Sequence, residues 1–446
     1  MMEQFNNINQ DELRVESAIK KILIKNDIPT VIIDIIISYN ERKKIYANLF
    51  SFAYILNDRV GSWGVNDYGG DSSIVSDKLI DIIDIIPNTH SYSAITKDRS
   101  VITWGSPFYG GDSNNVHNML VNVMSVHSTN LAFSAILKNG NVVSWGNHDC
   151  GGDNTSVNNM LKNVVSIYST HFAFCAKCYD GSVITWGNTI YGGNSSNVQN
   201  MLTNIKSIYS NAYAFSAIRD DGRVITWGSD ICGGNSSNVS DMLVNIISIN
   251  STFYAFSALR SDGRVFTWGN KVWGGDSSNV SHALVDIISI YSTKNRFIAI
   301  RKDSKIIIWG FSMVDERIQD IIDVFSTDKT FVAIRENGKV LSWNKCDIIK
   351  IVLVCSSANT FNIIQKLGLN VKWSNENDIT HENLMLTNIG LTYITDYAFA
   401  TIQNDNQIIS WGNTYNYNML KNIILMYLNN KTYAFIQKDG RVIIWK

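Results

Sequence analysis

Hydrophobic and polar positions alternate in short blocks along most of this chain of 446 residues, and the blocks recur at a fixed interval. One copy covers residues 214–228, where two segments rich in aromatic and β-branched residues are joined by a polar four-residue turn that ends in Gly222. Such segments around a short turn ending in glycine predict a β-hairpin. In the second strand, the two-residue period places Ile225 and Trp227 on the same face. The main element predicted for this chain is therefore a repeated hairpin.

A tryptophan marks each copy of the hairpin. Seven of them follow one another at intervals of 41 residues: Trp63, Trp104, Trp145, Trp186, Trp227, Trp268 and Trp309. Four more follow at looser spacing and bring the number of units to eleven: Trp343, Trp373, Trp411 and Trp445. A fixed period in this range predicts an array of one supersecondary unit. We expect these structural-repeat tryptophans to fill the space between neighbouring sheets, because eleven exposed indoles would promote aggregation.

The segment between one hairpin and the next has its own pattern. Each of the first six tryptophans is followed by Gly, a variable stretch, a Gly-Gly pair and then Asp or Asn, as at Asn194. Apolar residues between Val198 and Ile205 have the spacing i, i+3, i+4, i+7, which predicts one or two turns of helix with Asn194 as its N-cap. A third apolar strand, such as 205–210, closes the unit. Because Asp and Asn interchange at the capping position, we prefer a cap to a calcium or phosphate loop.

This pattern resembles the repeats of the regulator-of-chromosome-condensation (RCC1) family. In that family a strand with Ala and Leu leads through Asp-Gly into a Val-x-x-Trp-Gly strand and a glycine-rich loop. The matching segments here are residues 255–259, Asp262-Gly263, residues 265–269 and Gly274-Gly275. The resemblance covers roughly residues 50–446 and implies an all-β fold of propeller-type blades arranged round an axis.

Two features of the repeat depart from that family. The unit of 41 residues is short, so we expect the fourth strand of a blade to be missing or replaced by the short helix. Eleven units also exceed the roughly four to eight blades of a typical propeller. Two propellers, one large ring and an open array therefore remain as alternatives. The nucleotide-exchange activity of some family members is not carried over, because it depends on loops that have no match here.

The pattern divides the chain into three parts: a helical N-terminal segment at 1–49, regular RCC1-like repeats at 50–330, and degenerate RCC1-like repeats at 331–446. In the first part, apolar residues from Val15 to Leu23 form a helical stripe. The run 28–39 resembles the start of an F-box, with an apolar-Pro pair, two apolar doublets and Ser-Tyr. A true F-box would dock a ubiquitin-ligase core, but only about eleven residues separate this run from the first repeat strand. We therefore prefer a helical cap over the edge of the first repeat and keep an F-box-like segment as the alternative.

Composition excludes several classes of function. The net charge is −1 and charged residues make up 17% of the chain, so no basic footprint for nucleic acid is present. The longest apolar run, 31–37, is interrupted by Asp34 and is too short to span a membrane. The six cysteines share no common repeat position, which indicates reduced thiols and an intracellular location, cytoplasmic or nuclear. A virion or particle component is the alternative location.

Candidate chemistry is sparse. The one C-x-x-C pair, Cys175 and Cys178, lies on a predicted strand, where residues three apart face opposite sides. The seven histidines include no pair spaced for a metal on a helix, and no nucleophile elbow is present. We therefore predict no catalytic, metal-binding or cofactor-binding residues and no cofactor.

The sequence favours a non-enzymatic protein–protein interaction scaffold whose partner is not identified. The alternatives are a substrate adaptor of a ubiquitin ligase and a self-assembling structural protein. Trp273 is the only tryptophan outside the repeated position, and it lies in a variable loop before Gly274. It is the candidate binding residue, against the alternative that it packs where other units carry Tyr.

Overall fold

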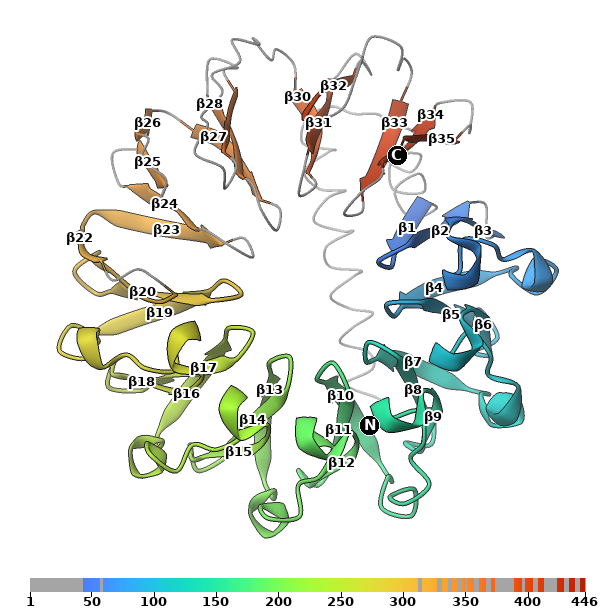
Figure 1. Ribbon diagram of the computed structural model, residues 1–446, viewed down its shortest axis with the longest axis horizontal. Coiled ribbons are helices and arrows are strands. Elements are labelled where there is room, and N and C mark those ends of the chain that lie inside the picture. The colour runs from blue at the N-terminus through green and yellow to red at the C-terminus, as the bar shows by residue number, and fades with distance from the viewer. Residues whose placement is uncertain are drawn as a thin grey trace, which may run out of the picture.

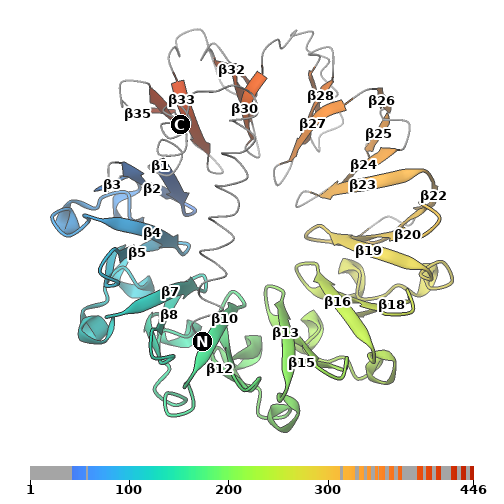
Figure 2. The ribbon, with the colours of Figure 1, turned by 180° about the vertical axis from the view of Figure 1, so that it is seen from behind.

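The computed structural model describes residues 43–56, 59–311 and 315–326, and beyond residue 326 only the strands named below. These residues form eleven antiparallel sheets. The sheets follow one another around a common axis, with the first strand of each sheet nearest the centre (Figures 1 and 2). Inner strands of successive sheets contact one another from β1 and β4 through to β30 and β33. Within the described residues, inner strands β33 and β1 do not contact each other as successive inner strands do. The sheets therefore form one continuous array that is open between these two strands, and not two propellers.

Each sheet is a meander of an inner, a middle and an outer strand. The inner strands are β1 (Lys43–Ala47), β4 (Ile82–Pro87), β7 (Val123–Ser128), β10 (Val164–Ser169), β13 (Ile205–Ser210), β16 (Ile246–Ser251), β19 (Ile287–Ser292), β23 (Ile321–Ser326), β27 (Ile351–Ser356), β30 (Ile389–Ile394) and β33 (Ile423–Leu428). The middle strands are β2 (Ser51–Leu56), β5 (Ser91–Thr96), β8 (Ala132–Leu137), β11 (Ala173–Cys178), β14 (Ala214–Arg219), β17 (Ala255–Arg260), β20 (Arg296–Arg301), β24 (Phe331–Arg335), β28 (Phe361–Gln365), β31 (Ala398–Gln403) and β34 (Tyr433–Gln437). The outer strands are β3 (Arg59–Gly64), β6 (Val101–Gly105), β9 (Val142–Gly146), β12 (Val183–Gly187), β15 (Val224–Gly228), β18 (Val265–Gly269), β21 (Ile306–Gly310), β25 (Lys339–Ser342), β29 (Asn370–Trp373), β32 (Ile408–Gly412) and β35 (Val442–Trp445).

Two sheets add a fourth strand at the outer edge: β22 (Asp315–Ile318) pairs with β21, and β26 (Asp347–Ile349) pairs with β25. The expectation that most blades lack this strand is therefore correct. In the fifth sheet, the segment after the Gly-Gly pair lies along the outer edge instead. Thr226 Oγ1 donates to Ser236 Oγ at 3.0 Å, and the Val224 N–H donates to the Leu243 carbonyl at 3.2 Å. This segment shields an edge that would otherwise be open to pairing with another chain.

The predicted third strand belongs to a different sheet from the one expected. Strand β13 pairs with β14 of the following hairpin and not with the hairpin that precedes it. The connection between them is only three residues long, which is the length of a tight turn between antiparallel neighbours. Because each inner strand precedes the hairpin with which it pairs, the first sheet begins at Lys43, within the segment predicted to be a helical N-terminal part. The remainder of that part, residues 1–42 with the F-box-like run, lies outside the described residues.

Short 3-10 turns replace the predicted helices. The segment 198–205 contains η7 (Gln199–Met201), which is one turn long, and Ile205 already starts β13. The turn ends at Leu202, and Asn204, with a positive φ of 54°, leads the chain into β13. Asn194 accepts the Ser196 N–H at 2.9 Å, so it caps the bend that leads into this segment.

The other short turns occupy two positions in the repeat. Those after the tryptophans are η1 (Asn66–Tyr68), η3 (Pro107–Tyr109), η5 (His148–Cys150), η6 (Thr189–Gly193), η8 (Asp230–Cys232) and η10 (Lys271–Trp273). Those before the inner strands are η2 (Ser73–Val75), η4 (Asn114–Met119), η9 (Ser240–Met242) and η11 (Ser278–Val280). Gly192 shows why the Gly-Gly pair follows the first group. Its φ is 106°, and a Cβ there would lie 2.6 Å from the ring of Phe215 in the next sheet.

The tryptophans hold neighbouring sheets together. Trp227 is 4% exposed, stacks on Phe215 of its own hairpin at a centroid distance of 5.3 Å, and donates its indole N–H to the Gly192 carbonyl of the preceding unit at 3.2 Å. The same bond, at 3.0–3.2 Å, is made by Trp104, Trp145, Trp186, Trp268 and Trp309. Trp373, Trp411 and Trp445 lie in strands and pair with an aromatic residue of the middle strand, as Trp227 does. Trp343 lies outside the described residues.

The first sheet differs from the others. Its middle strand carries Tyr54 where regular units have Ala, and its outer strand carries Gly61 where they have a larger apolar residue. These two residues are cross-strand partners, and a Cβ at Gly61 would lie 2.3 Å from the Tyr54 ring. The indole nitrogen of Trp63 is buried and has no hydrogen-bond acceptor in the part of the chain that the structure describes. A terminal repeat with altered packing is typical of a stacked array.

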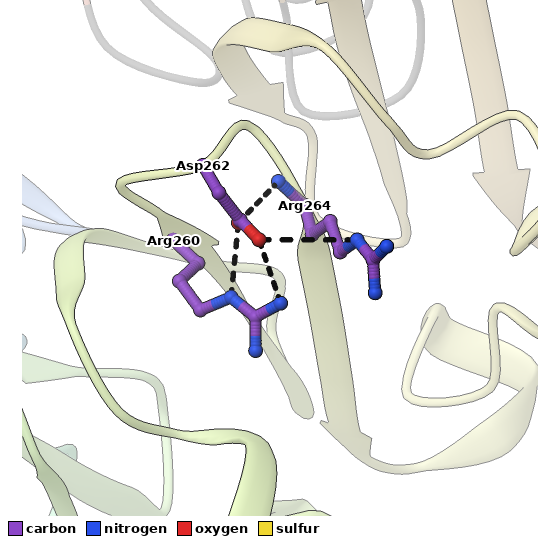
Figure 3. A network of polar contacts seen from close by, with 3 residues as sticks. All are labelled: Arg260, Asp262 and Arg264. Carbon is purple, nitrogen blue, oxygen red and sulfur yellow. Dashed lines mark hydrogen bonds and ion pairs between the residues drawn. The ribbon is translucent and has the colours of Figure 1, made fainter.

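The two ends of the strands face opposite sides of the array. The turn between inner and middle strands lies at the same end as the loop after the tryptophan, and the Asp-Gly turn lies at the other end. In the sixth sheet, Arg260 donates to both carboxylate oxygens of Asp262 at 2.9 and 2.7 Å, and the Arg264 N–H donates to Asp262 at 3.1 Å (Figure 3). The Arg260 contact holds the pKa of Asp262 down at about 2. The Asp-Gly turn of this sheet is therefore charged.

Candidate functional site

On the opposite face, each turn from inner to middle strand is held by an Asn or Thr side chain. Asn211 accepts the backbone N–H groups of Tyr213 and Ala214 at 2.9 and 2.8 Å. Its side-chain amide donates to the carbonyl of Cys232, in the loop after the tryptophan, at 2.7 Å. Thr252 bonds the carbonyl of Trp273 in the same way at 2.9 Å. The capping residue thus fixes the turn and the loop together, and the side chains of the two residues at the tip of the turn take no part in these bonds.

In three neighbouring sheets, the fourth to the sixth, these tips and loops carry aromatic side chains. We call the group the aromatic shelf, and it consists of His171, Phe172, Tyr191, Tyr213, Phe253, Tyr254 and Trp273. The rings contact one another in sequence across the sheets. Tyr191 lies 5.0 Å from Tyr213, and Tyr213 lies 5.5 Å from Tyr254 with the ring planes only 5° apart. Tyr254 meets the edge of Trp273 at 4.4 Å.

The shelf is partly exposed to solvent. All seven rings are half-buried, unlike the tryptophans between the sheets. Beside it, three loops present an apolar residue four positions after the tryptophan: Ile190 (64% exposed), Ile231 (72%) and Val272 (55%). A contiguous apolar and aromatic surface of this kind marks an interaction site more often than a structural one.

The charge on the shelf is low at neutral pH. Burial lowers the pKa of His171 below its usual value, and the nearby positive charge of Lys294 lowers it further. Burial also raises the pKa of Tyr213, with a smaller contribution from Tyr254. Lys294 itself lies over the Phe253 ring, with its Nζ 5.8 Å from the centroid. The shelf is therefore an uncharged aromatic surface with a cation at one end.

A groove of about 420 Å³ crosses the shelf. Tyr213 and Tyr254 line it, with Tyr191 and Trp273 also among the lining rings. Ile231, Ser229, Cys232 and Asn270 complete the lining, which contains no charged side chain.

Trp273 is thus placed beside the residues that could form a site with it. It lies in η10 and belongs to the aromatic shelf, whereas the repeated tryptophans lie between sheets. The other shelf residues escaped the sequence analysis. A signal for them exists, because the tips Phe253-Tyr254 and His171-Phe172 are apolar or aromatic at turn positions where polar residues are usual.

The four cysteines whose side chains the structure describes do not form a site. Cys178 packs in the same core cluster as Phe174, whereas Cys175 packs with Phe215 of the next sheet, so the two thiols face opposite sides. Burial raises the pKa of Cys175 well above its usual value and that of Cys150 to about 11, so both thiols are poor nucleophiles at neutral pH. Among the described residues, no cluster of three or more His, Cys, Asp or Glu side chains could hold a metal. No helix in the described part of the chain is long and apolar enough to cross a membrane.

The fold and this surface define a propeller-type repeat protein. The eleven sheets themselves confirm the predicted propeller-type repeat organisation. No family model matches the chain, and no curated protein matches it.

Solved structures do resemble it. The yeast RCC1 protein Prp20 in complex with Kap60 is 15% identical, covering 75% of this chain and 81% of that one with a TM-score of 0.31. Prp20p from Saccharomyces cerevisiae, described with its binding to Gsp1p and histones, is 14% identical, covering 84% and 83% with a TM-score of 0.30. The CRINKLY WD40 ectodomain of the Arabidopsis thaliana receptor kinase ACR4 is 15% identical, covering 55% and 92% with a TM-score of 0.29. Similarities of this size say nothing of activity.

Proposed function

We propose that the chain is a non-enzymatic scaffold that binds another protein through the aromatic shelf. The observation that supports this most is the half-exposure of seven mutually contacting aromatic rings on turns that are shaped by other residues. Tyr and Trp provide large contact areas at low cost in conformational entropy, and they are enriched at protein interfaces. Ile231 and its neighbours extend the apolar area beyond the rings.

Ile231→Asp is the most direct test, because this side chain is 72% exposed and its replacement leaves the core intact. The matched control is Phe108→Asp, at the same repeat position in the second unit and 81% exposed. The full chain and both variants would be used to capture proteins from cells that contain it, and the captured proteins would be quantified by mass spectrometry.

We expect at least one protein that binds in stoichiometric amount to the wild type and to Phe108→Asp and is lost with Ile231→Asp. Retention of every captured protein by Ile231→Asp would overturn the assignment of the shelf. Sedimentation of the purified chain provides a second check. A dimer that Ile231→Asp dissociates would show that the shelf serves self-assembly, and would contradict binding of a different protein.

A further inference from the structure

The groove on the shelf offers hydrogen-bond donors that the protein itself does not use. The indole N–H of Trp273 and the side-chain amide N–H groups of Asn270 have no acceptor among the described residues. The amide oxygen of Asn270, in contrast, already accepts the Val272 N–H at 3.1 Å. The lining thus combines flat aromatic faces with spare donors and contains neither a carboxylate nor a cation.

Aromatic rings beside spare donors favour a ligand whose backbone carbonyl groups are free to accept hydrogen bonds. A helical ligand uses its carbonyl groups internally, so it would leave these donors without partners. A polyproline-type segment has no internal hydrogen bonds and presents its carbonyl oxygens outward, and each proline replaces an N–H by an apolar ring. Proline rings pack well on aromatic surfaces, which is how several proline-binding domains recognise their ligands. A saccharide would also stack on the rings, and the tyrosine hydroxyl groups in the lining can accept from it, so saccharides form the competing class in the test.

We propose that this groove binds an uncharged, extended, proline-containing segment of the partner protein. Tyr213 and Tyr254 come from adjacent sheets, stack on each other and line the groove. They form the surface on which a proline ring packs. Trp273 and Asn270 donate to carbonyl oxygens of the segment. Burial lowers the pKa of His171, which favours the neutral ring at pH 7. An uncharged ligand therefore matches the rings of the shelf. This inference rests on the proposed function, since it specifies the partner of the same surface.

The test uses the full chain and a pool of acetylated, amidated peptides Ala-Pro-Xaa-Xaa-Pro-Xaa-Ala, in which Xaa is any uncharged residue. Binding would be measured by calorimetry and by the fluorescence of Trp273, whose half-exposed indole differs in environment from the buried ones. A second pool has both prolines replaced by alanine, and neutral tetrasaccharides serve as the competing class. The variants are Trp273→Ala and, as a control at the same repeat position in the second unit, Tyr109→Ala.

We expect saturable binding of members of the proline pool, at least about tenfold weaker binding by their alanine counterparts, and an equal loss in Trp273→Ala, as for an aromatic hot spot. Tyr109→Ala should bind within about twofold of the wild type. Absence of binding by every member of the proline pool overturns the inference, as does equal binding of the alanine pool or binding of saccharides alone. If Ile231→Asp still abolishes capture of a protein partner in that case, the proposed function stands and only the class of ligand is wrong.

Discussion

Removal of one indole N–H measures how strongly neighbouring sheets are joined. Trp227 donates to the carbonyl of Gly192 in the preceding unit at 3.2 Å, and five other tryptophans make the equivalent bond. Trp63 occupies the same position in the first sheet, yet its indole nitrogen is buried without an acceptor in the described residues. Among the described residues, Trp63 is therefore an internal control, in which the donor is present and the bond is not.

The perturbation is replacement of the indole by 3-benzothienylalanine, which keeps the bicyclic shape and removes the donor. At Trp227 this removes a buried hydrogen bond and leaves the Gly192 carbonyl without its partner, at a cost of about 1–3 kcal/mol. At Trp63 the same replacement removes a buried donor that has no acceptor, so stability should stay the same or rise by up to about 1 kcal/mol. The expected difference between the two sites is thus about 2 kcal/mol in the free energy of unfolding.

A stacked array does not unfold in one step, so a single denaturation midpoint is not enough. Native-state hydrogen exchange resolved by peptide reports the local opening free energy of β14 and β15 separately from that of β2 and β3. The replacement at Trp227 should lower protection in the fourth and fifth sheets, which the bond connects. An equal loss of protection after replacement at Trp63 would refute the reasoning, because it would show that the indole shape and not the hydrogen bond stabilises the contact.

Two further predictions concern single sheets. In the first sheet, Gly61→Ile and Tyr54→Ala should each lower the opening free energy of β2 and β3, and the double variant should restore it to within about 1 kcal/mol of the wild type. Additive losses in the hydrogen exchange of these two strands would contradict the compensation. In the third sheet, burial lowers the pKa of His127 from 6.5 to about 4, so the unfolded chain binds a proton more readily than the folded chain does. The free energy of unfolding should therefore decrease as the pH falls from about 6.5 towards 4, by at most about 3 kcal/mol. His127→Tyr, the residue type of six other units at this position, should remove that pH dependence from the hydrogen-exchange protection of β7 and β8, and a slope that persists would contradict the assignment.

The sequence was sufficient for the hairpins but not for their grouping into sheets. Strands β14 and β15 match the predicted segments, because alternation and an Asp-Gly turn act within about fifteen residues. The partner of β13 could not be derived from the period, since a spacing of 41 residues is the same whether the unit begins or ends with that strand. The short connection through Asn211, whose side chain caps the turn, is the local signal that β13 pairs with the hairpin that follows it.

The same capping explains why the shelf could not be predicted and why it points to binding. In the seventh sheet, Thr293 caps a turn whose tip is Lys294-Asn295, and its Oγ1 accepts the Arg296 N–H at 3.0 Å as Thr252 accepts that of Ala255 at 3.1 Å. Polar tips therefore form the turn as well as Phe253-Tyr254 do. Since the turn does not require aromatic tips, the exposed part of these rings is a cost in solvation, although Tyr254 also packs against the core of its sheet. Binding by a partner that covers them removes that cost, and this is the physical reason to seek the function of the chain on this face.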